Sequence, residues 1–261
     1  MKDQLNRTIP LKLTPKRIVS LVPSQTELLY NLGLETSIVG ITKFCVHPKH
    51  LLQTKTIVGG TKQVHFSKIK ALNPEIILCN KEENTEEMIE ELEKIAPVHL
   101  SDIYTIEDCM ELINMYGVMF LVENQAEKII TSIKSEQLKF QEFIKFQPNL
   151  KTVYFIWKNP WMVAAKNTFI NALLSESYFE NHFKELERYP EIDLDKDIDK
   201  DVEVIMLSTE PFPFKEKDVA ELKVKFPQAK VMLVDGELFS WYGSRLSKSF
   251  EYFRRLRQKY Q

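Results

Sequence analysis

The chain has 261 residues, of which 44% are hydrophobic, so it is long enough for one large or two modest domains with adequate cores. Its 35 Lys and Arg residues nearly balance its 37 Asp and Glu residues, which leaves no strong positive field for nucleic acid. No apolar run approaches the ~20 residues of a membrane span. Three widely spaced cysteines suggest no disulfide framework and fit a reducing compartment.

The first 16 residues are polar and lack the apolar stretch and the small-residue cleavage site of an export signal. The sequence as given therefore predicts either a cytosolic protein or one whose export signal has been removed or is encoded elsewhere.

In the first half of the chain, short apolar runs that are typical of buried strands alternate with segments of helical periodicity. The predicted strands are residues 17–22, 38–42, 75–79 and 98–100. The predicted helices are residues 25–32, 66–72, 84–95 and 105–116. Strands that alternate with helices indicate βαβ units and a parallel sheet.

A long polar segment follows, over residues 118–146, with neither Gly nor Pro. Its apolar residues fall mostly at three- and four-residue steps, which predicts one long helix with a single buried stripe. At ~1.5 Å per residue such a helix would span about 40 Å. Pro148 and Asn149 would end it.

The alternation then resumes. The predicted strands are residues 152–157, 202–207 and 230–234, and the predicted helices are residues 167–174, 217–225 and 244–258. Because the order of elements resembles that of the first half, we infer an internal duplication, which pairs Glu86 with Glu216. The predicted fold is α/β, with two related Rossmann-like lobes that contain parallel sheets. An N-terminal lobe (1–117) and a C-terminal lobe (149–261) would be joined by an interlobe helix (118–148).

Ligands of open α/β sheets bind beyond the carboxyl ends of the strands, and domain interfaces are preferred pocket sites. The loops after the first strand of each lobe should therefore line an interlobe cleft. Ser24 and Glu27 follow the first strand with the spacing of a capping box. Alternatively, the free backbone N–H groups of this helix start face the cleft and bind a polar group of the ligand.

The loop after the second strand reads Lys43-Phe44-Cys45-Val46-His47-Pro48. Cys45 and His47 alone do not make a closed zinc site, which needs four ligands. We expect Phe44 and His47 to stack on or abut a ligand. His47 alternatively ligates a metal that an organic ligand already holds.

All three tryptophans lie in the second half, at Trp157, Trp161 and Trp241. Core packing is the usual role of such rings. Here they fall in predicted loops, together with Tyr242, which suits a large, flat, partly apolar ligand. Arg245 is predicted at the first position of the last helix, where a cation opposes the helix dipole. It is therefore either a ligand-holding group or a surface arginine.

Catalytic signatures are missing, since the sequence has no G-x-S-x-G, P-loop, G-x-G-x-x-G or H-E-x-x-H motif. The alternating aspartates of residues 193–201 lack the Gly and Glu that a calcium loop requires, which indicates a solvated segment. The protein is therefore predicted not to be an enzyme.

The segments PSQTE, VGITKFCVHP, VGGTK and LNPEIIL resemble the periplasmic-binding-protein family that serves ABC importers of cobalamin, ferric siderophores and haem. The resemblance is greatest to the cobalamin-binding members. It implies a monomer of two α/β lobes with one rigid interlobe helix, no required cofactor, and a metal chelate as ligand. It also implies an ABC permease dimer as partner and a periplasmic location, whereas the missing signal predicts a cytoplasmic one.

The resemblance places ligand-contacting aromatic residues in the loops described above and implies a permease-docking glutamate on each lobe. The one on the N-terminal lobe matches Glu86, and the internal duplication places the other at Glu216. The expected ligand-binding residues are Pro23, Ser24, Gln25, Phe44, Cys45, His47, Trp157, Trp161, Glu210, Trp241, Tyr242 and Arg245.

The sequence thus predicts the substrate-binding component of an importer for a cobalamin-like corrinoid or another metal chelate, such as a ferric siderophore or haem. The alternatives are a cytosolic carrier or sensor of the same ligands and a metal-chelatase-like enzyme.

Overall fold

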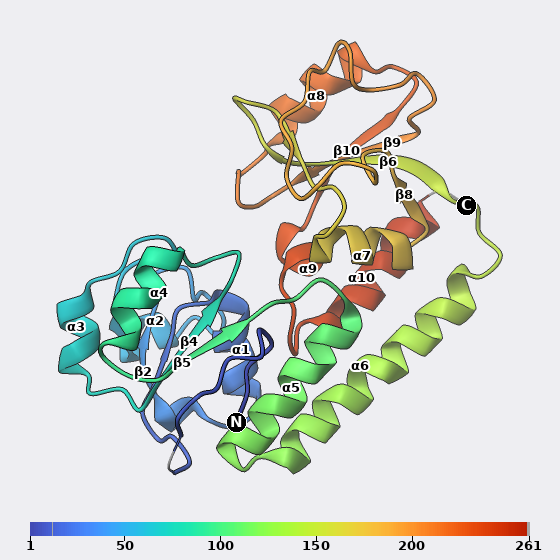
Figure 1. Cartoon of the computed structure of the whole chain (residues 1–261). Helices are drawn as coiled ribbons and strands as arrows, with labels where there is room; N and C mark the ends of the chain where they lie inside the picture. Colours follow the sequence, from blue (N-terminus) through green and yellow to red (C-terminus); the bar gives the residue numbers. More distant parts are fainter. Residues whose placement is uncertain (12, 260–261) are drawn as a thin grey trace. The chain divides into compact units, whose positions relative to one another are not determined.

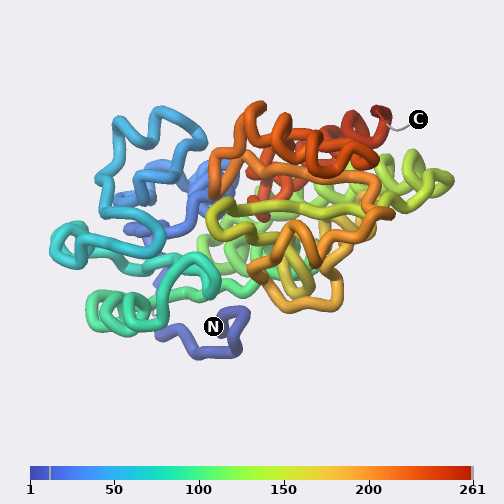
Figure 2. The backbone as a smooth tube through the Cα atoms, turned by 90° about the horizontal axis from the view of Figure 1, so that it is seen from above, coloured from blue at the N-terminus to red at the C-terminus, as the bar shows by residue number. Residues whose placement is uncertain are grey.

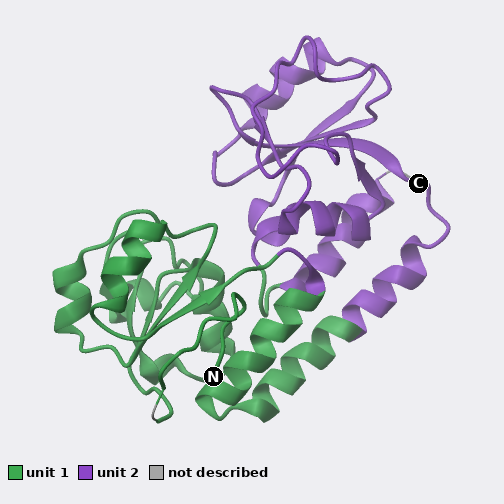
Figure 3. Cartoon of the chain, in the orientation of Figure 1, with its two compact units in different colours: residues 1–103, 107–134, 242–245 green, residues 104–106, 135–241, 246–261 purple. Residues whose placement is uncertain are grey.

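We describe the protein from a computed structural model, in which residues 1–11 and 13–259 are described. The chain forms two compact units (Figure 3). Unit 1 consists of Met1–Ile103, Glu107–Lys134 and Tyr242–Arg245, and unit 2 consists of Tyr104–Ile106, Ser135–Trp241 and the chain from Leu246 onward. The course of the backbone can be followed in Figure 2.

Unit 1 is built on a five-stranded sheet in the order β3-β2-β1-β4-β5, and all its strand pairs are parallel (Figure 1). Its strands are β1 (Ile18–Ser20), β2 (Ile38–Ile41), β3 (Thr56–Ile57), β4 (Ile76–Asn80) and β5 (Val98–Ser101). The central strands are short apolar runs that are buried on both faces, as the helical crossovers of a parallel sheet require. The prediction of parallel strands is confirmed here, and β3 is an additional strand that the sequence did not reveal.

The crossover helices of unit 1 follow the predicted order. They are α1 (Pro23–Asn31), the single turn α2 (Leu51–Thr54), α3 (Phe66–Ala71), α4 (Glu86–Glu93) and most of α5 (Ile106–Phe120), with a short 3-10 helix at Glu35–Ser37. The core between α4 and the sheet includes Met88, Ile89 and Leu92 on the helix, all buried. This helix therefore has the predicted amphipathic pattern.

The predicted single helix over residues 118–146 is wrong at its start, because α5 continues to Phe120 and a separate helix, α6 (Glu123–Ile144), follows. Leu121 has a positive φ of 55°. Its N–H donates to the Val118 carbonyl, and the Val122 N–H donates to that of Gly117. This pair of bonds is the Schellman end of a helix, with leucine where Gly or Asn is usual. Because no Gly or Pro marks the break, the helical periodicity of the sequence continues across it.

Unit 2 contains a second five-stranded sheet in the order β10-β9-β6-β7, with β8 also paired to β6 (Figure 1). Its strands are β6 (Leu150–Trp157), β7 (Met162–Val163), β8 (Phe179–Asn181), β9 (Val204–Ser208) and β10 (Lys230–Val234). All pairs are parallel except β6 with β7, which is antiparallel. The α/β fold with parallel sheets is confirmed, and the two-residue strand β7 is its exception.

The helices of unit 2 are α7 (Phe169–Glu176), α8 (Glu216–Lys225), α9 (Gly236–Ser240), α10 (Leu246–Gln258) and the second half of α6. The short helix α9 was not predicted. The units differ from the predicted domain limits in three ways, since they assign Tyr104–Ile106 to unit 2, divide α6 after Lys134 and assign Tyr242–Arg245 to unit 1. No helix among residues 1–11 and 13–259 is long and apolar enough to cross a bilayer.

Candidate ligand-binding site

In unit 1 the loop after β1 is buried. Pro23, Ser24 and Gln25 all lie inside, and α1 already begins at Pro23, with Val22 as an N-cap that has no side-chain hydrogen bond. The predicted capping box of Ser24 and Glu27 is therefore wrong. Proline fits the first position of a helix, so the helix starts one residue before Ser24, and Ser24 cannot be its cap.

The Gln25 amide has several hydrogen-bonding partners in the interior of unit 1. Its Nε2 donates to Ser101 Oγ at 2.6 Å and to Tyr242 OH at 3.0 Å, and Tyr116 OH donates to its Oε1 at 2.7 Å. A buried amide with both ends bonded satisfies a need of the fold itself. Gln25 thus joins α1, β5 and α5, and its expected contact with a ligand stays a prediction.

The segment Tyr242–Arg245, which we call the strap, is buried in unit 1. Arg245 donates to both carboxylate oxygens of Glu27, with distances of 2.7 and 3.2 Å, and the two side chains are only 9% and 6% exposed. Gly243 has a φ of +94°, and its N–H donates to Cys109 Sγ at 3.0 Å. Tyr242 is 6% exposed.

The strap therefore corrects two expectations about Arg245. The helix α10 begins at Leu246, so Arg245 does not occupy its first position. The guanidinium forms a buried ion pair with Glu27, so the alternative of a surface arginine is wrong, whereas its expected role in holding a ligand group stays a prediction. Tyr242, which was expected in an exposed loop, is likewise part of the interior.

The residues of the loop after β2 differ in their exposure to solvent. Phe44 is 47% exposed, with the Lys43 ammonium 5.0 Å from its ring centroid, and His47 is half-buried. Cys45 is buried, its Sγ lies 3.1 Å from Thr26 Oγ1 and 3.2 Å from Thr42 Oγ1, and burial raises the pKa of its thiol. Phe44 and His47 can thus meet a ligand, whereas Cys45 faces the interior.

In unit 2 an aromatic pair lies at the carboxyl end of the sheet. Trp157, the last residue of β6, is 39% exposed and meets Phe212 edge to face, with 5.5 Å between ring centroids. Phe212 belongs to the loop after β9, and its N–H donates to the carbonyl of Ile156. Sequence reasoning missed Phe212. Its only signal was the alternation Pro211-Phe212-Pro213-Phe214, which begins three residues after the end of a buried strand.

Trp161 packs inward, against the hydrophobic core of unit 2. Its ring stacks on Phe214 with 6.0 Å between centroids and meets Phe155 at 5.0 Å. The Lys158 ammonium lies over the same ring and pairs with Asp218 and Glu221 at 2.9 and 2.5 Å. Trp161 is thus half-buried by its own neighbours, and the surface ring of this loop is Trp157.

Glu210 follows β9 and is half-buried. Its Oε1 lies 2.6 Å from Ser240 Oγ, and the Trp241 indole also hydrogen-bonds the carboxylate. Burial raises the pKa of the Glu210 carboxyl. Gly236 leaves room for this arrangement, because a Cβ there would lie 2.5 Å from Glu210 Cγ. Trp241 itself is only 8% exposed, so it anchors the end of α9 and has little surface to offer a ligand.

Glu86 and Glu216 occupy equivalent places in the two units. Each is the first residue of a helix that follows a buried strand, and both are exposed. Their carboxylates suit the positive end of the helix dipole, and their exposure leaves them accessible to a partner protein.

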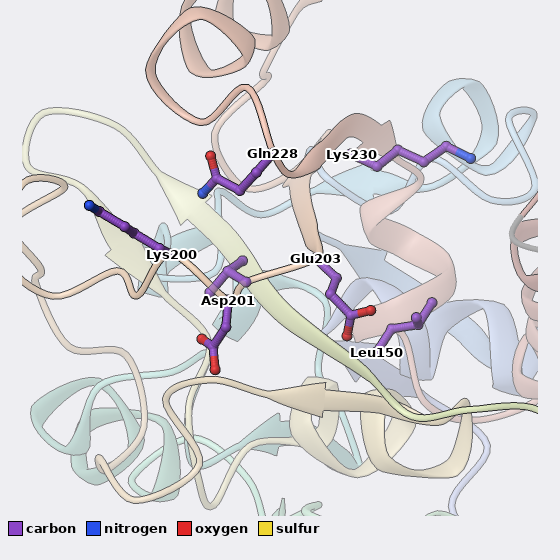
Figure 4. Close-up of a pocket in the computed structure, with 7 residues that line it drawn as sticks. Leu150, Lys200, Asp201, Glu203, Gln228 and Lys230 are labelled. Atoms are coloured by element: carbon purple, nitrogen blue, oxygen red, sulfur yellow. The ribbon is translucent and has the colours of Figure 1, made fainter.

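A pocket of about 450 Å³ opens on unit 2 at the other edge of the sheet (Figure 4). Its lining comes from the residues at or just before the amino ends of three strands: Leu150, Lys200, Asp201, Val202, Glu203, Gln228 and Lys230. Ligands of α/β sheets bind at carboxyl ends, so this pocket does not correspond to the predicted site. No cluster of three or more metal-ligating side chains occurs in the part of the chain that the structure describes.

Comparisons with solved structures agree with this fold. The periplasmic vitamin B12-binding protein BtuF of Vibrio cholerae superimposes with a TM-score of 0.77 at 18% identity, over 94% of this chain and 99% of that one. A periplasmic haem-binding protein from Pseudomonas aeruginosa gives 0.78 at 20% identity, over 93% and 92%. At these identities the likeness shows the fold alone.

Sequence comparisons extend the result. An uncharacterised ABC transporter substrate-binding lipoprotein of Bacillus subtilis, YvrC, is 28% identical over 187 residues. The match covers 69% of this chain and 59% of that protein's length. A family model described as periplasmic binding protein matches residues 18–226, which is most of both units. The chain therefore belongs to the periplasmic binding protein family.

Proposed function

We propose that the chain is the substrate-binding component of an ABC-type importer and that it binds a metal chelate. A cobalamin-like corrinoid is the first candidate, and a ferric siderophore or haem is the alternative. The family membership supports the transport role, as does the name of the Bacillus subtilis relative. Relatives named as vitamin B12-binding proteins support the choice of ligand, at 24% identity over 47% of this chain.

The observation that carries the proposal is the pair of Trp157 and Phe212 at the carboxyl edge of unit 2. Partly exposed rings held in place by neighbouring strands give a rigid apolar surface with little entropy to lose on binding. In unit 1 the half-exposed Phe44 and His47 lie at the corresponding edge, after β2. We propose that the ligand binds against the aromatic pair of unit 2.

Titration of the protein with cyanocobalamin, haem and a ferric hydroxamate tests the ligand, with visible absorption and calorimetry as readouts. We expect a band shift and a micromolar or lower Kd for one of them. Flat titrations with all three would contradict the proposal.

We propose further that Glu86 and Glu216 dock the protein to a permease dimer outside the cytoplasm. A charge reversal of both, Glu86→Lys with Glu216→Lys, should abolish ligand uptake by cells and leave the Kd of the purified protein unchanged. Glu251→Lys, at an exposed position of α10, is the matched control. If uptake survives the double reversal and the native protein fractionates with the cytosol, a carrier or sensor of the same ligand is the better description.

A further inference from the structure

We propose that Glu210 determines ligand specificity at the carboxyl edge of unit 2, favouring chelates with hydrogen-bond donors such as carboxamides at their rim and disfavouring chelates with carboxylates there. This inference rests on the proposed function, because it assumes that a chelate binds against Trp157 and Phe212. It concerns the charge of the ligand, which the fold and the aromatic residues leave undetermined.

Glu210 lies in the loop after β9, two residues beyond the end of the strand and two residues before Phe212. The backbone N–H of Phe212 donates to the carbonyl of Ile156, next to Trp157. The carboxyl group thus belongs to the same loop as one of the two rings, beside the strand that ends in the other. A flat ligand on these rings would bring its rim substituents to this loop.

The Glu210 carboxylate is a hydrogen-bond acceptor, and an ionised carboxylate has about four acceptor positions. Ser240 Oγ and the Trp241 indole are its partners from the end of α9 and the residue after it, and they fix its orientation. The half-buried side chain keeps acceptor positions for an N–H of the ligand. A group held in place in this way binds a donor at a low cost in side-chain entropy.

The surroundings of Glu210 disfavour negative charge. Burial raises the pKa of the Glu210 carboxyl, and the charges of Glu237 and Asp235 raise it as well, whereas the hydrogen bonds from Ser240 and Trp241 lower it. Another negative charge at this place is therefore unfavourable, and a ligand carboxylate would add one. Repulsion of the wrong ligand is an ordinary route to specificity.

A ligand carboxylate would need a cation to offset this repulsion. Arg245, the arginine that the sequence offered for an anionic group, is buried against Glu27. Lys158, which follows Trp157, is engaged by Asp218 and Glu221. Neither side chain is available for a ligand carboxylate without losing a bond that the fold already makes.

The test compares two corrinoids with the same ring, cyanocobalamin, whose rim carries carboxamides, and dicyanocobyrinic acid, whose rim carries carboxylates. Their Kd values are measured for the wild type, Glu210→Gln and Glu251→Gln. Glu251 lies on α10 in unit 2 with its side chain 68% exposed, so its variant removes the same charge at a distance from the loop.

We expect the wild type to bind the carboxamide form at least about tenfold more tightly, and Glu210→Gln to reduce that preference about tenfold, chiefly by binding the carboxylate form better. Glu251→Gln should leave the preference unchanged. If Glu210→Gln weakens both ligands equally, the residue is only structural and the inference is wrong, as it is if the wild type prefers the carboxylate form. If the wild type binds neither corrinoid and no haem, the proposed function itself fails.

Discussion

The carboxyl edges of the two sheets are used differently. In unit 1 the strap packs against α1, which follows β1, and the polar side chains of Gln25 and Glu27 are bonded in the interior to Ser101, Tyr242 and Arg245. In unit 2 the loops after β6 and β9 leave Trp157 and Phe212 partly exposed, with Trp161 and Phe214 as their support in the core. Two sheets of similar construction therefore differ at this edge: after β1 in unit 1 the polar side chains are bonded in the interior, whereas after β6 and β9 in unit 2 two aromatic rings stay partly exposed.

The Glu27–Arg245 pair allows the sharpest test of this difference. Arg245→Met should lower the free energy of unfolding by about 3–5 kcal/mol, because it leaves the Glu27 carboxylate buried without its partner. Urea denaturation monitored by circular dichroism measures the change. The double variant Glu27→Leu with Arg245→Met should regain most of the loss.

An exposed pair provides the control. Arg255 and Glu251 on α10 form an ion pair with side chains 65% and 68% exposed. Arg255→Met should cost less than about 1 kcal/mol. If Arg245→Met costs no more than this, the strap is not a stabilising element of unit 1.

A buried histidine makes the stability of unit 1 sensitive to acid. His99 on β5 is fully buried, its ring meets Tyr116 at 5.2 Å, and burial lowers its pKa from 6.5 to about 4, with Asp3 and Arg7 nearby. The folded state thus resists protonation that the unfolded state accepts. The stability is complete above pH 6.5 and falls as the pH drops toward 4, by about 3 kcal/mol for this group.

Urea unfolding at pH 7, 5.5 and 4 measures this loss, and the His99→Phe variant isolates it from other titrating groups. We expect the free energy of unfolding of the variant to rise relative to that of the wild type as the pH falls, because only the wild type loses stability through His99. A constant difference across the three pH values would mean that His99 is not the group responsible.

The two tryptophans of the loop after β6 should separate stability from binding. Trp161→Ala should cost about 2–4 kcal/mol of stability, since the ring stacks on Phe214 in the core. Trp157→Ala should cost less than about 1 kcal/mol of stability but weaken ligand binding about tenfold or more, because the ring is exposed at the carboxyl edge. Thermal unfolding and ligand titration of both variants measure the two effects. The reverse pattern would exchange the roles of these residues.

The sequence predicted the fold well because periodicity and buried apolar runs are local signals. The strands β4 and β9 and the helices α4 and α8 lie within a few residues of their predicted limits. The end of α5 just before Leu121 was missed, because Leu121 has a left-handed backbone but is neither Gly nor Asn, the residues that usually mark such a helix end.

The site was harder to predict, because the exposure of a loop residue depends on partners that are distant in the chain. Arg245 is 218 positions away from Glu27, and Tyr242 is 217 positions away from Gln25. An aromatic residue before a helix has the same local pattern whether it meets a ligand or another part of the fold. Only the three-dimensional structure separates Trp157, which is exposed, from Trp241 and Tyr242, which are buried.

Tyr242→Phe is the mildest test of this difference between exposed and buried aromatic residues, because it removes one hydroxyl group and keeps the ring. The hydroxyl accepts a bond from Gln25 and lies 3.4 Å from Ser101 Oγ, so its loss should cost about 1–2 kcal/mol of stability. The affinity for the ligand should not change, since Tyr242 is only 6% exposed. A loss of affinity with no loss of stability would instead place Tyr242 at the ligand.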